Sequence, residues 1–237
     1  MTVELCYDGL KNMQSLQQLE ADQVVRFSAA KLELGDSQLE QIKRFKSIVL
    51  LYLDDTIVSD KSLPTIASFI HLSVLRINGT DITGSGFSCL KNMVAMKDLS
   101  IKGINLKPGS LSTIKTWTPN LTSIDASKCG LTAVDIPPLA QLTKLETLDL
   151  AGNKTLDDAC IKQLQPLVNL QQLRISDTSI TAKSLPDIYK LPALKTVVIR
   201  SRQFWLGSKQ QKTRLGITFK DIGDETRIPI EVFSPPH

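Results

Sequence analysis

The chain has 237 residues, of which 42% are hydrophobic and 5% aromatic, and its formal net charge is +4. This length allows one large domain or two small ones. The charge excess lies in residues 195–237 and is smaller than the basic stripe of nucleic-acid-binding proteins, so no nucleic-acid partner is expected. The sequence contains no run of about 18 apolar residues, which predicts that no helix spans a membrane.

The cysteines are widely and unequally spaced, and none forms a CxxC pair: they are Cys6, Cys89, Cys129 and Cys160. This spacing argues against a metal knuckle or a disulfide framework, so we expect reduced, mostly buried thiols. The first residues lack a basic start followed by an apolar stretch, which predicts no Sec-type signal peptide. We therefore expect a cytoplasmic protein, or one translocated into a host cell without such a signal.

Residues 1–23 are predicted to form an N-terminal capping helix. Four apolar residues recur there at a spacing of three: Leu10, Met13, Leu16 and Leu19. This spacing is typical of an amphipathic helix over residues 8–22, and Asp8 can serve as its N-cap.

A repeat of 24 or 25 residues follows, and its template is the pattern L-x-x-L-x-L-x-x-T-x-I of residues 72–82. The same frame starts at Val24, Ile48, Leu72, Met96, Leu121, Leu145, Leu170 and Leu194. The fourth and sixth positions of every copy are also apolar, which predicts a short strand in each. A second apolar set follows at a spacing of three, as in Leu63, Ile66 and Phe69, and predicts a short helix. Neither element can bury its apolar side alone, so neighbouring copies must stack.

These repeats resemble those of leucine-rich-repeat proteins. Residues 79–87 and 179–185 look like the cysteine-containing, ribonuclease-inhibitor-like variety of repeat. The resemblance implies an α/β solenoid over residues 24–202, curved, with a parallel sheet on the concave side, short helices on the convex side, and about seven full repeats plus caps. The family usually has Asn or Cys at the ninth position, where only Cys129 and Asn153 match.

Residues 203–237 are predicted to form a C-terminal cap and tail. An open solenoid exposes apolar surface at its ends, and the aromatic cluster Phe204-Trp205-Leu206 can cover the last repeat. Residues 215–219 and 228–233 alternate weakly between apolar and polar residues, which favours a hairpin.

Catalytic groups are sparse in this sequence. Its two histidines are His71, at a repeat boundary, and His237, the last residue. Gly84-Ser85-Gly86 lacks the residues of a phosphate-binding loop. Asp157 and Asp158 stand at the predicted start of a helix, where carboxylates interact favourably with the helix dipole. We therefore expect no enzymatic activity, no cofactor and no metal site.

The variable positions of each strand would point to the concave side and form the binding face. Two groups stand out: Leu50, Tyr52, Val74 and Arg76 combine apolar and aromatic residues with an arginine, and Asp125, Glu146 and Asp149 form an acidic zone with Arg174, Arg200 and Arg202 beyond it. The predicted contact residues are Leu50, Tyr52, Asp54, Val74, Arg76, Asn78, Ser100, Lys102, Asp125, Glu146, Asp149, Arg174 and Arg200.

The expected function is therefore to bind, and to regulate or inhibit, another protein through the concave face. The resemblance suggests a monomer that acts as a stand-alone bacterial effector. The alternative is a substrate-recognition adaptor for a ubiquitin ligase supplied by a second chain, because residues 1–23 and 203–237 are too few for an F-box or a catalytic ligase domain.

Overall fold

The computed structural model describes residues 3–6, 20, 22, 24–91, 93–200 and 217–221. The chain divides into two compact units, Met1–Leu121 and Thr122–His237, which are described separately. Of the predicted capping helix over residues 8–22, only Glu20 and Asp22 are described, and neither is helical. The cluster at residues 204–206, Arg202 and the predicted strand at residues 228–233 lie outside the described residues.

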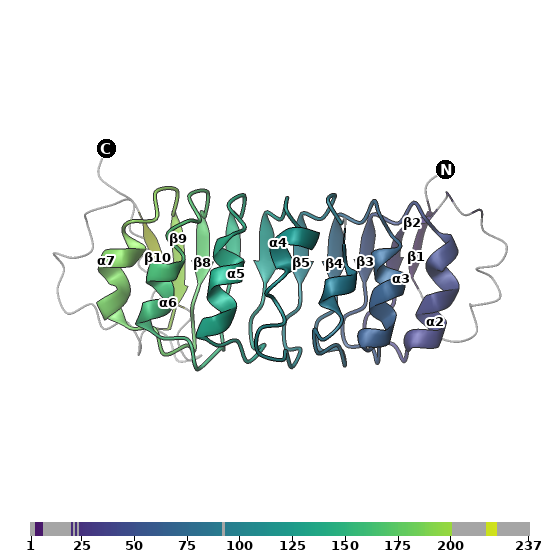
Figure 1. The fold of residues 1–237 in the computed structure, drawn as a ribbon, viewed down its shortest axis with the longest axis horizontal. Coiled ribbons are helices and arrows are strands. Elements are labelled where there is room, and N and C mark those ends of the chain that lie inside the picture. Colours follow the sequence, from purple (N-terminus) through teal and green to yellow (C-terminus); the bar gives the residue numbers. More distant parts are fainter. Residues whose placement is uncertain are drawn as a thin grey trace. The chain divides into compact units, whose positions relative to one another are not determined.

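The first unit contains a parallel sheet whose strands lie side by side in chain order (Figure 1). Its strands are β1 (Val3–Cys6), β2 (Val24–Ser28), β3 (Leu50–Tyr52), β4 (Val74–Arg76) and β5 (Asp98–Ser100). The register aligns Phe27, Leu51, Leu75 and Leu99, and all four side chains are fully buried. The repeat frame predicted from the sequence is therefore the register of this sheet.

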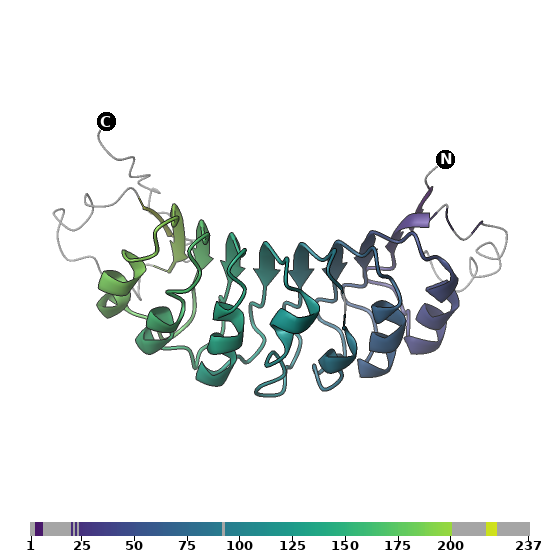
Figure 2. The same ribbon diagram turned by 45° about the horizontal axis from the view of Figure 1, so that its top comes forward.

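The helices of the first unit lie on one side of its sheet (Figure 2). They are α2 (Asp36–Gln41), η2 (Ile42–Arg44), η3 (Asp60–Ser62), α3 (Leu63–Ala67), η4 (Phe87–Cys89) and α4 (Ile114–Trp117). Their apolar residues face the strands: Leu63, Ile66 and Phe69 of one repeat are fully buried. Each helix is only one or two turns long, so its stability comes from this packing rather than from intrinsic helix propensity.

The second unit has the same plan. Its strands are β6 (Ser123–Asp125), β7 (Thr147–Asp149), β8 (Gln172–Arg174), β9 (Thr196–Ile199) and β10 (Thr218–Asp221), all parallel. Its helices are η5 (Ala133–Asp135), α5 (Ile136–Ala140), α6 (Asp158–Gln163), η6 (Ala182–Ser184) and α7 (Leu185–Ile188), and they also lie on one side of the strands (Figure 2). Both units therefore confirm the predicted α/β repeat.

Two strands lie outside the predicted repeat. β1 pairs in parallel with β2, where Leu5 aligns with Phe27, although the sequence predicted only a helix in residues 1–23. β10 overlaps the strand expected at residues 215–219 and pairs in parallel with β9, where Phe219 aligns with Val197; the hairpin with residues 228–233 stays a prediction. Each of these strands continues the sheet of its unit in the register of the repeats.

The eighth position of the repeat has a left-handed backbone. Positive φ angles occur there in seven copies, at Lys31, Asp55, Gly79, Gly103, Lys128, Gly152 and Asp177. At Gly79, φ is +60°, and an added Cβ would lie 2.5 Å from Oδ1 of Asp55. The turn after each strand thus requires a conformation that favours glycine, and Asp and Lys adopt it in four copies.

Buried side chains at the ninth position hold these turns in place. The carboxamide of Asn153 donates to the carbonyls of Ala126 and Leu150, and it accepts from the backbone N–H groups of Cys129 and Leu131. The hydroxyls of Thr56, Thr80 and Thr178 instead donate to a carbonyl in their own repeat. Asn153 therefore links two repeats, while each of these hydroxyl contacts stays within one.

A second link joins the helical sides of two neighbouring repeats. The carboxylate of Asp36 accepts hydrogen bonds from the backbone N–H of Ser59 at 2.8 Å, from the hydroxyl of Ser59 at 2.7 Å, and from the hydroxyl of Ser62. Burial alone would raise the pKa of Asp36. The hydrogen bonds from Ser62 and Ser59 and the charge of Lys61 together outweigh burial, and they lower the pKa below its ordinary value of 3.8.

This link predicts an acid-sensitive contribution to stability. Replacing Asp36 with alanine should lower the free energy of unfolding at pH 7 by about 1–2 kcal/mol, because the hydrogen bonds to a half-exposed carboxylate are lost. Since the folded state has the lower pKa, the contribution is present above pH 3.8 and is lost as the pH falls from 3.8 toward the folded-state value. Urea unfolding of both proteins at several pH values should show their difference shrinking in acid. The matched Glu33→Ala variant, which changes an exposed acid of the same turn, should behave as the wild type. A difference that does not depend on pH would contradict the assignment.

Candidate functional site

The side of each sheet that carries no helices is called the open face of its unit. In the first unit it displays Arg26, Ser28, Leu50, Tyr52, Val74, Arg76, Asp98 and Ser100. In the second it displays Ser123, Asp125, Thr147, Asp149, Gln172, Arg174, Thr196 and Val198. Most of these residues alternate with the buried ones, as the half-buried Leu50 and Tyr52 do on either side of the buried Leu51, whereas Ser100 and Val198 are themselves buried. The open faces are thus the surfaces that the sequence predicted as the concave binding face.

An aromatic ring between two arginines lies on the open face of the first unit. The guanidinium of Arg26 lies 4.9 Å from the centroid of the Tyr52 ring, and that of Arg76 lies 5.7 Å from it. Both distances fall within the range of cation–π attraction. Tyr52 and Arg76 align in neighbouring strands, whereas Arg26 aligns with Leu50. The contact residues predicted from the sequence included Tyr52 and Arg76 and left out Arg26. The repeat frame already placed Arg26 on the neighbouring strand, diagonal to Tyr52.

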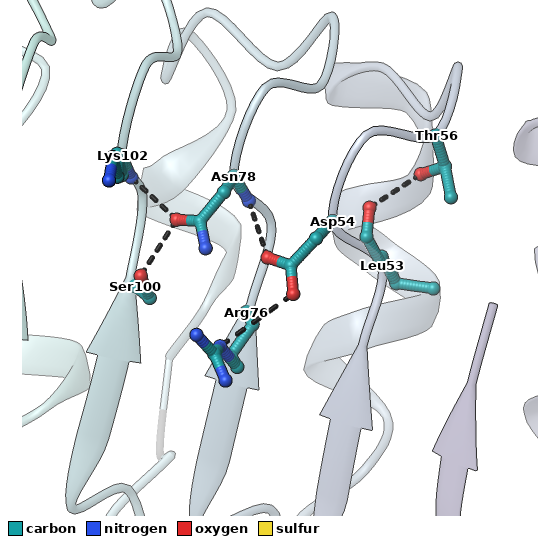
Figure 3. Close-up of polar contacts among 7 residues, drawn as sticks. All are labelled: Leu53, Asp54, Thr56, Arg76, Asn78, Ser100 and Lys102. Atoms are coloured by element: carbon teal, nitrogen blue, oxygen red, sulfur yellow. Dashed lines mark hydrogen bonds and ion pairs between the residues drawn. The ribbon is translucent and has the colours of Figure 1, made fainter. Parts of the chain in front are cut away.

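Polar side chains at the ends of β3, β4 and β5 form a continuous chain (Figure 3). Asp54 pairs with Arg76 at 3.6 Å and accepts a hydrogen bond from the backbone N–H of Asn78 at 3.2 Å. The side-chain oxygen of Asn78 in turn accepts from the hydroxyl of Ser100 and the backbone N–H of Lys102, both at 2.7 Å. Carboxylate and carboxamide are therefore held in fixed orientations.

The predicted contact residues among these hydrogen-bonded side chains have different roles. Arg76 and Lys102 are exposed, and Asp54 and Asn78 are half-buried, so all four remain open to a partner. Ser100, in contrast, is only 5% exposed, and its hydroxyl orients Asn78. Leu50 and Val74 are half-buried and align in adjacent strands, where they add an apolar strip beside Tyr52.

On the open face of the second unit, opposite charges are paired. Asp125 and Asp149 each accept a hydrogen bond from the backbone two residues later, at 2.9 Å. Asp149 also lies 3.8 Å from the guanidinium of Arg174. Elsewhere in the unit, Arg200 pairs with Asp177 at 2.9 Å, and the exposed Glu146 accepts from the side chain of Gln171 at 3.3 Å. In the strand register Asp125 aligns with Asp149 and Asp149 with Arg174, so the two acidic residues lie side by side and the arginine lies beyond them.

The described residues also show the setting of the groups considered for catalysis. His71 is exposed in the turn before β4. Cys129 and Cys160 are buried, as expected, whereas Cys89 is exposed. Desolvation raises the pKa values of the Cys89 and Cys160 thiols, which favours the protonated, weakly nucleophilic form. Within the described ranges, no group of three or more His, Cys, Asp or Glu side chains is placed to hold a metal ion, and no helix has the length and hydropathy needed to cross a bilayer.

Comparisons with known proteins agree with this geometry. Residues 119–167 match the family described as Leucine Rich repeats (2 copies), while no curated protein matches the sequence. Among solved structures, internalin C2 from Listeria monocytogenes has a TM-score of 0.62 at 21% identity, over 81% of this chain and 79% of that one. An internalin, InlF, from the same species has a TM-score of 0.63 at 15% identity, over 90% of this chain and 63% of that one.

At such low identities, the similarity to these structures concerns the fold. The cysteine-containing variety of repeat is not tested by these comparisons and stays a prediction. The sequence frame, the parallel sheets with their short helices, the family match over residues 119–167 and the similar structures nevertheless agree: the chain has the leucine-rich-repeat fold.

Proposed function

We propose that this protein is a non-catalytic module that binds another protein through the open face of its first unit. The observation that carries the proposal is the stack of Arg26, Tyr52 and Arg76. Tyrosine and arginine are the residue types enriched in the energetically dominant parts of protein interfaces. Here they are brought together on a surface that the helices do not cover.

The stack is suited to binding because its geometry is fixed before a partner arrives. The ring of Tyr52 is half-buried, and its two cation–π contacts restrict it further. Arg76 is also held by Asp54 at 3.6 Å. Groups that are already ordered lose less conformational entropy on binding, which leaves more of the contact energy as affinity. Tyrosine adds a large amphipathic surface with few rotatable bonds.

The chemistry around the stack indicates what kind of surface it would accept. Leu50 and Val74 offer an apolar strip, and the guanidinium of Arg76 and the ammonium of Lys102 are exposed nearby. A complementary partner would therefore present an apolar or aromatic side chain with carboxylates beside it. The paired charges of Asp149 and Arg174 on the second unit are proposed as a separate contact area.

The proposal of a non-catalytic role is supported by the thiols. Because desolvation raises the pKa values of Cys89 and Cys160, the nucleophilic thiolate is disfavoured at neutral pH. A protein that covers its partner's surface regulates it by occlusion, and we include regulation or inhibition of the partner in the proposal. The effector role, the monomeric state and the cytoplasmic location expected from the sequence stay predictions.

Affinity purification with charge-reversed variants tests the proposal. We expect the wild-type chain to retain a specific protein that Arg76→Glu loses, because the guanidinium is replaced by a like charge for the partner's carboxylates. Arg174→Glu tests whether the open face of the second unit also contributes to binding the partner. The matched control is Lys162→Glu on α6, which changes the net charge equally but lies on the helical side. Retention of the same proteins by all variants would overturn the proposal, and specific co-purification of ubiquitin-ligase subunits would favour an adaptor role.

A further inference from the structure

Three turns of the first unit lie at the N-terminal ends of its strands and are together called the basic edge: residues 43–49, 67–73 and 91–97. They lead into β3, β4 and β5. Backbone hydrogen bonds of 2.8 Å connect them, from the N–H of Ser73 to the carbonyl of Val49 and from the N–H of Lys97 to the carbonyl of Ser73. Neighbouring turns therefore lie about one strand spacing, roughly 4.8 Å, apart where they enter the strands.

The charges of this edge differ from those of the turns that follow β2, β3 and β4 at the other ends of the strands. The basic edge contains five basic residues and no Asp or Glu: Lys43, Arg44, Lys46, Lys91 and Lys97. All five are exposed, and Lys43 pairs with Glu40, which lies just before the turn. The turns that follow β2, β3 and β4, residues 30–36, 54–60 and 78–84, contain six acidic residues and one basic residue: Glu33, Asp36, Asp54, Asp55, Asp60, Asp81 and Lys31. The turn that follows β5 differs, because it contains Lys102 and Lys107. The basic edge thus lies opposite three acidic turns.

Exposed aliphatic side chains accompany the positive charges. Ile70 is 57% exposed and Val94 is 54% exposed. They occupy the same position in successive turns, because the backbone N–H of Leu72 bonds to Phe69 and that of Met96 bonds to Met93, both at 3.0 Å. Lys46 has the equivalent position in the turn before them. The aromatic residues of these turns, Phe45 and Phe69, are fully buried.

We propose that the basic edge makes a peripheral contact with an anionic phospholipid surface. Lysines around exposed aliphatic side chains suit the boundary between headgroups and acyl chains, where the charges attract anionic lipids and the aliphatic groups enter the apolar layer. The long lysine side chains can reach back to the phosphate level while Ile70 and Val94 descend below it. Single-stranded nucleic acid would instead require exposed aromatic rings for base stacking, and the rings at this edge are buried. This surface differs from the open face, so the proposal does not depend on the proposed function.

Vesicle co-sedimentation of the full-length chain tests the proposal. We expect binding to phosphatidylcholine vesicles that contain phosphatidylserine, little binding to phosphatidylcholine alone, and weaker binding as salt is raised. The Lys46→Gln/Lys91→Gln double variant should bind about 20-fold more weakly, because each lysine near an anionic surface contributes about fivefold. The Ile70→Ser/Val94→Ser variant should lose about tenfold or more by the removal of buried apolar area.

A matched control tests whether vesicle binding depends on where the lysines lie or only on how many there are. Lys154→Gln/Lys162→Gln removes two exposed lysines of the second unit, and this variant should bind vesicles within about twofold of the wild type, because only lysines close to the membrane surface contribute to binding. Equal losses in both double variants would overturn the proposal, because the attraction would then follow net charge alone. No binding to the phosphatidylserine vesicles, or binding to duplex DNA with none to vesicles, would also overturn it. Circular dichroism of each variant verifies that it is folded.

Discussion

Replacing Asn153 with alanine should lower the free energy of unfolding by about 3–4 kcal/mol. The side chain is 1% exposed and makes four hydrogen bonds to the backbone. Alanine would leave the buried N–H groups of Cys129 and Leu131 without these bonds, and each buried group left unsatisfied costs about 1–3 kcal/mol. Urea unfolding measures this change. Amide hydrogen exchange should show faster exchange at Cys129 and Leu131, because their protection depends on the Asn153 carboxamide.

The matched control is Thr178→Val, at the ninth position of the following repeat. Its hydroxyl donates to the carbonyl of Ile175 at 2.7 Å and accepts from the N–H of Ile180 at 3.3 Å, both in its own repeat. Because valine has nearly the same shape but no hydroxyl, the loss of these bonds should cost about 1–2 kcal/mol. If Asn153→Ala costs no more than Thr178→Val, then Asn153 does not hold neighbouring repeats together.

Replacing Tyr52 with alanine should weaken partner binding by about 30-fold, or roughly 2 kcal/mol, without unfolding the protein. The variant removes the ring that lies between Arg26 and Arg76. Both guanidinium groups would then lose a packing surface, so the variant loses the contact of Tyr52 itself and the fixed positions of its neighbours. Isothermal titration calorimetry with the partner captured by the wild-type chain measures the change.

Tyr52→Phe is the conservative control for this prediction. Phenylalanine keeps an aromatic face for the two arginines, so the binding constant should stay within about threefold of the wild type. An affinity of Tyr52→Ala equal to that of the wild type, with an unchanged circular dichroism spectrum, would exclude the stack as a binding determinant. A loss in Tyr52→Phe as large as that in Tyr52→Ala would assign the effect to the hydroxyl rather than to the ring.

The repeat was predictable because burial requires an apolar residue at the same position of each copy. Leu51, Leu75 and Leu99 are fully buried at equivalent positions in the aligned strands, so polar substitutions at these positions would be costly and the period is visible. The strand alternation around them also placed Tyr52 and Arg76 on the open side of the sheet. The fold and the face could therefore be derived from apolar spacing alone.

The outer strands were not assigned to the repeat because they break that spacing. Phe219 aligns with Val197 only 22 residues earlier, which is shorter than the repeat, and Gly216 stands where the frame expects an apolar residue. At the other end, β1 precedes the first frame start. The left-handed turn position was hidden as well, because Lys31, Asp55, Lys128 and Asp177 occupy it where glycine would have signalled it.

The polar chain of the first unit depends on side-chain direction, which apolar periodicity does not specify. A signal was nevertheless present, since Asp54 and Asn78 hold the same position in successive repeats, and such side chains can bond to nearby backbone N–H groups. The pairing of Asp149 with Arg174 follows from strand order once the frame is known. Along β6, β7 and β8 the order is Asp125, Asp149 and Arg174, which is the order that the sequence frame predicts.

Site-specific photo-crosslinking tests the central claim, that a partner protein binds the open face of the first unit. A photoreactive residue at Ser28, next to Tyr52 in the strand register, should crosslink to the captured partner. The same residue at exposed Lys115 on α4, on the helical side, should not. Crosslinks from position 115 with none from position 28 would contradict the claim.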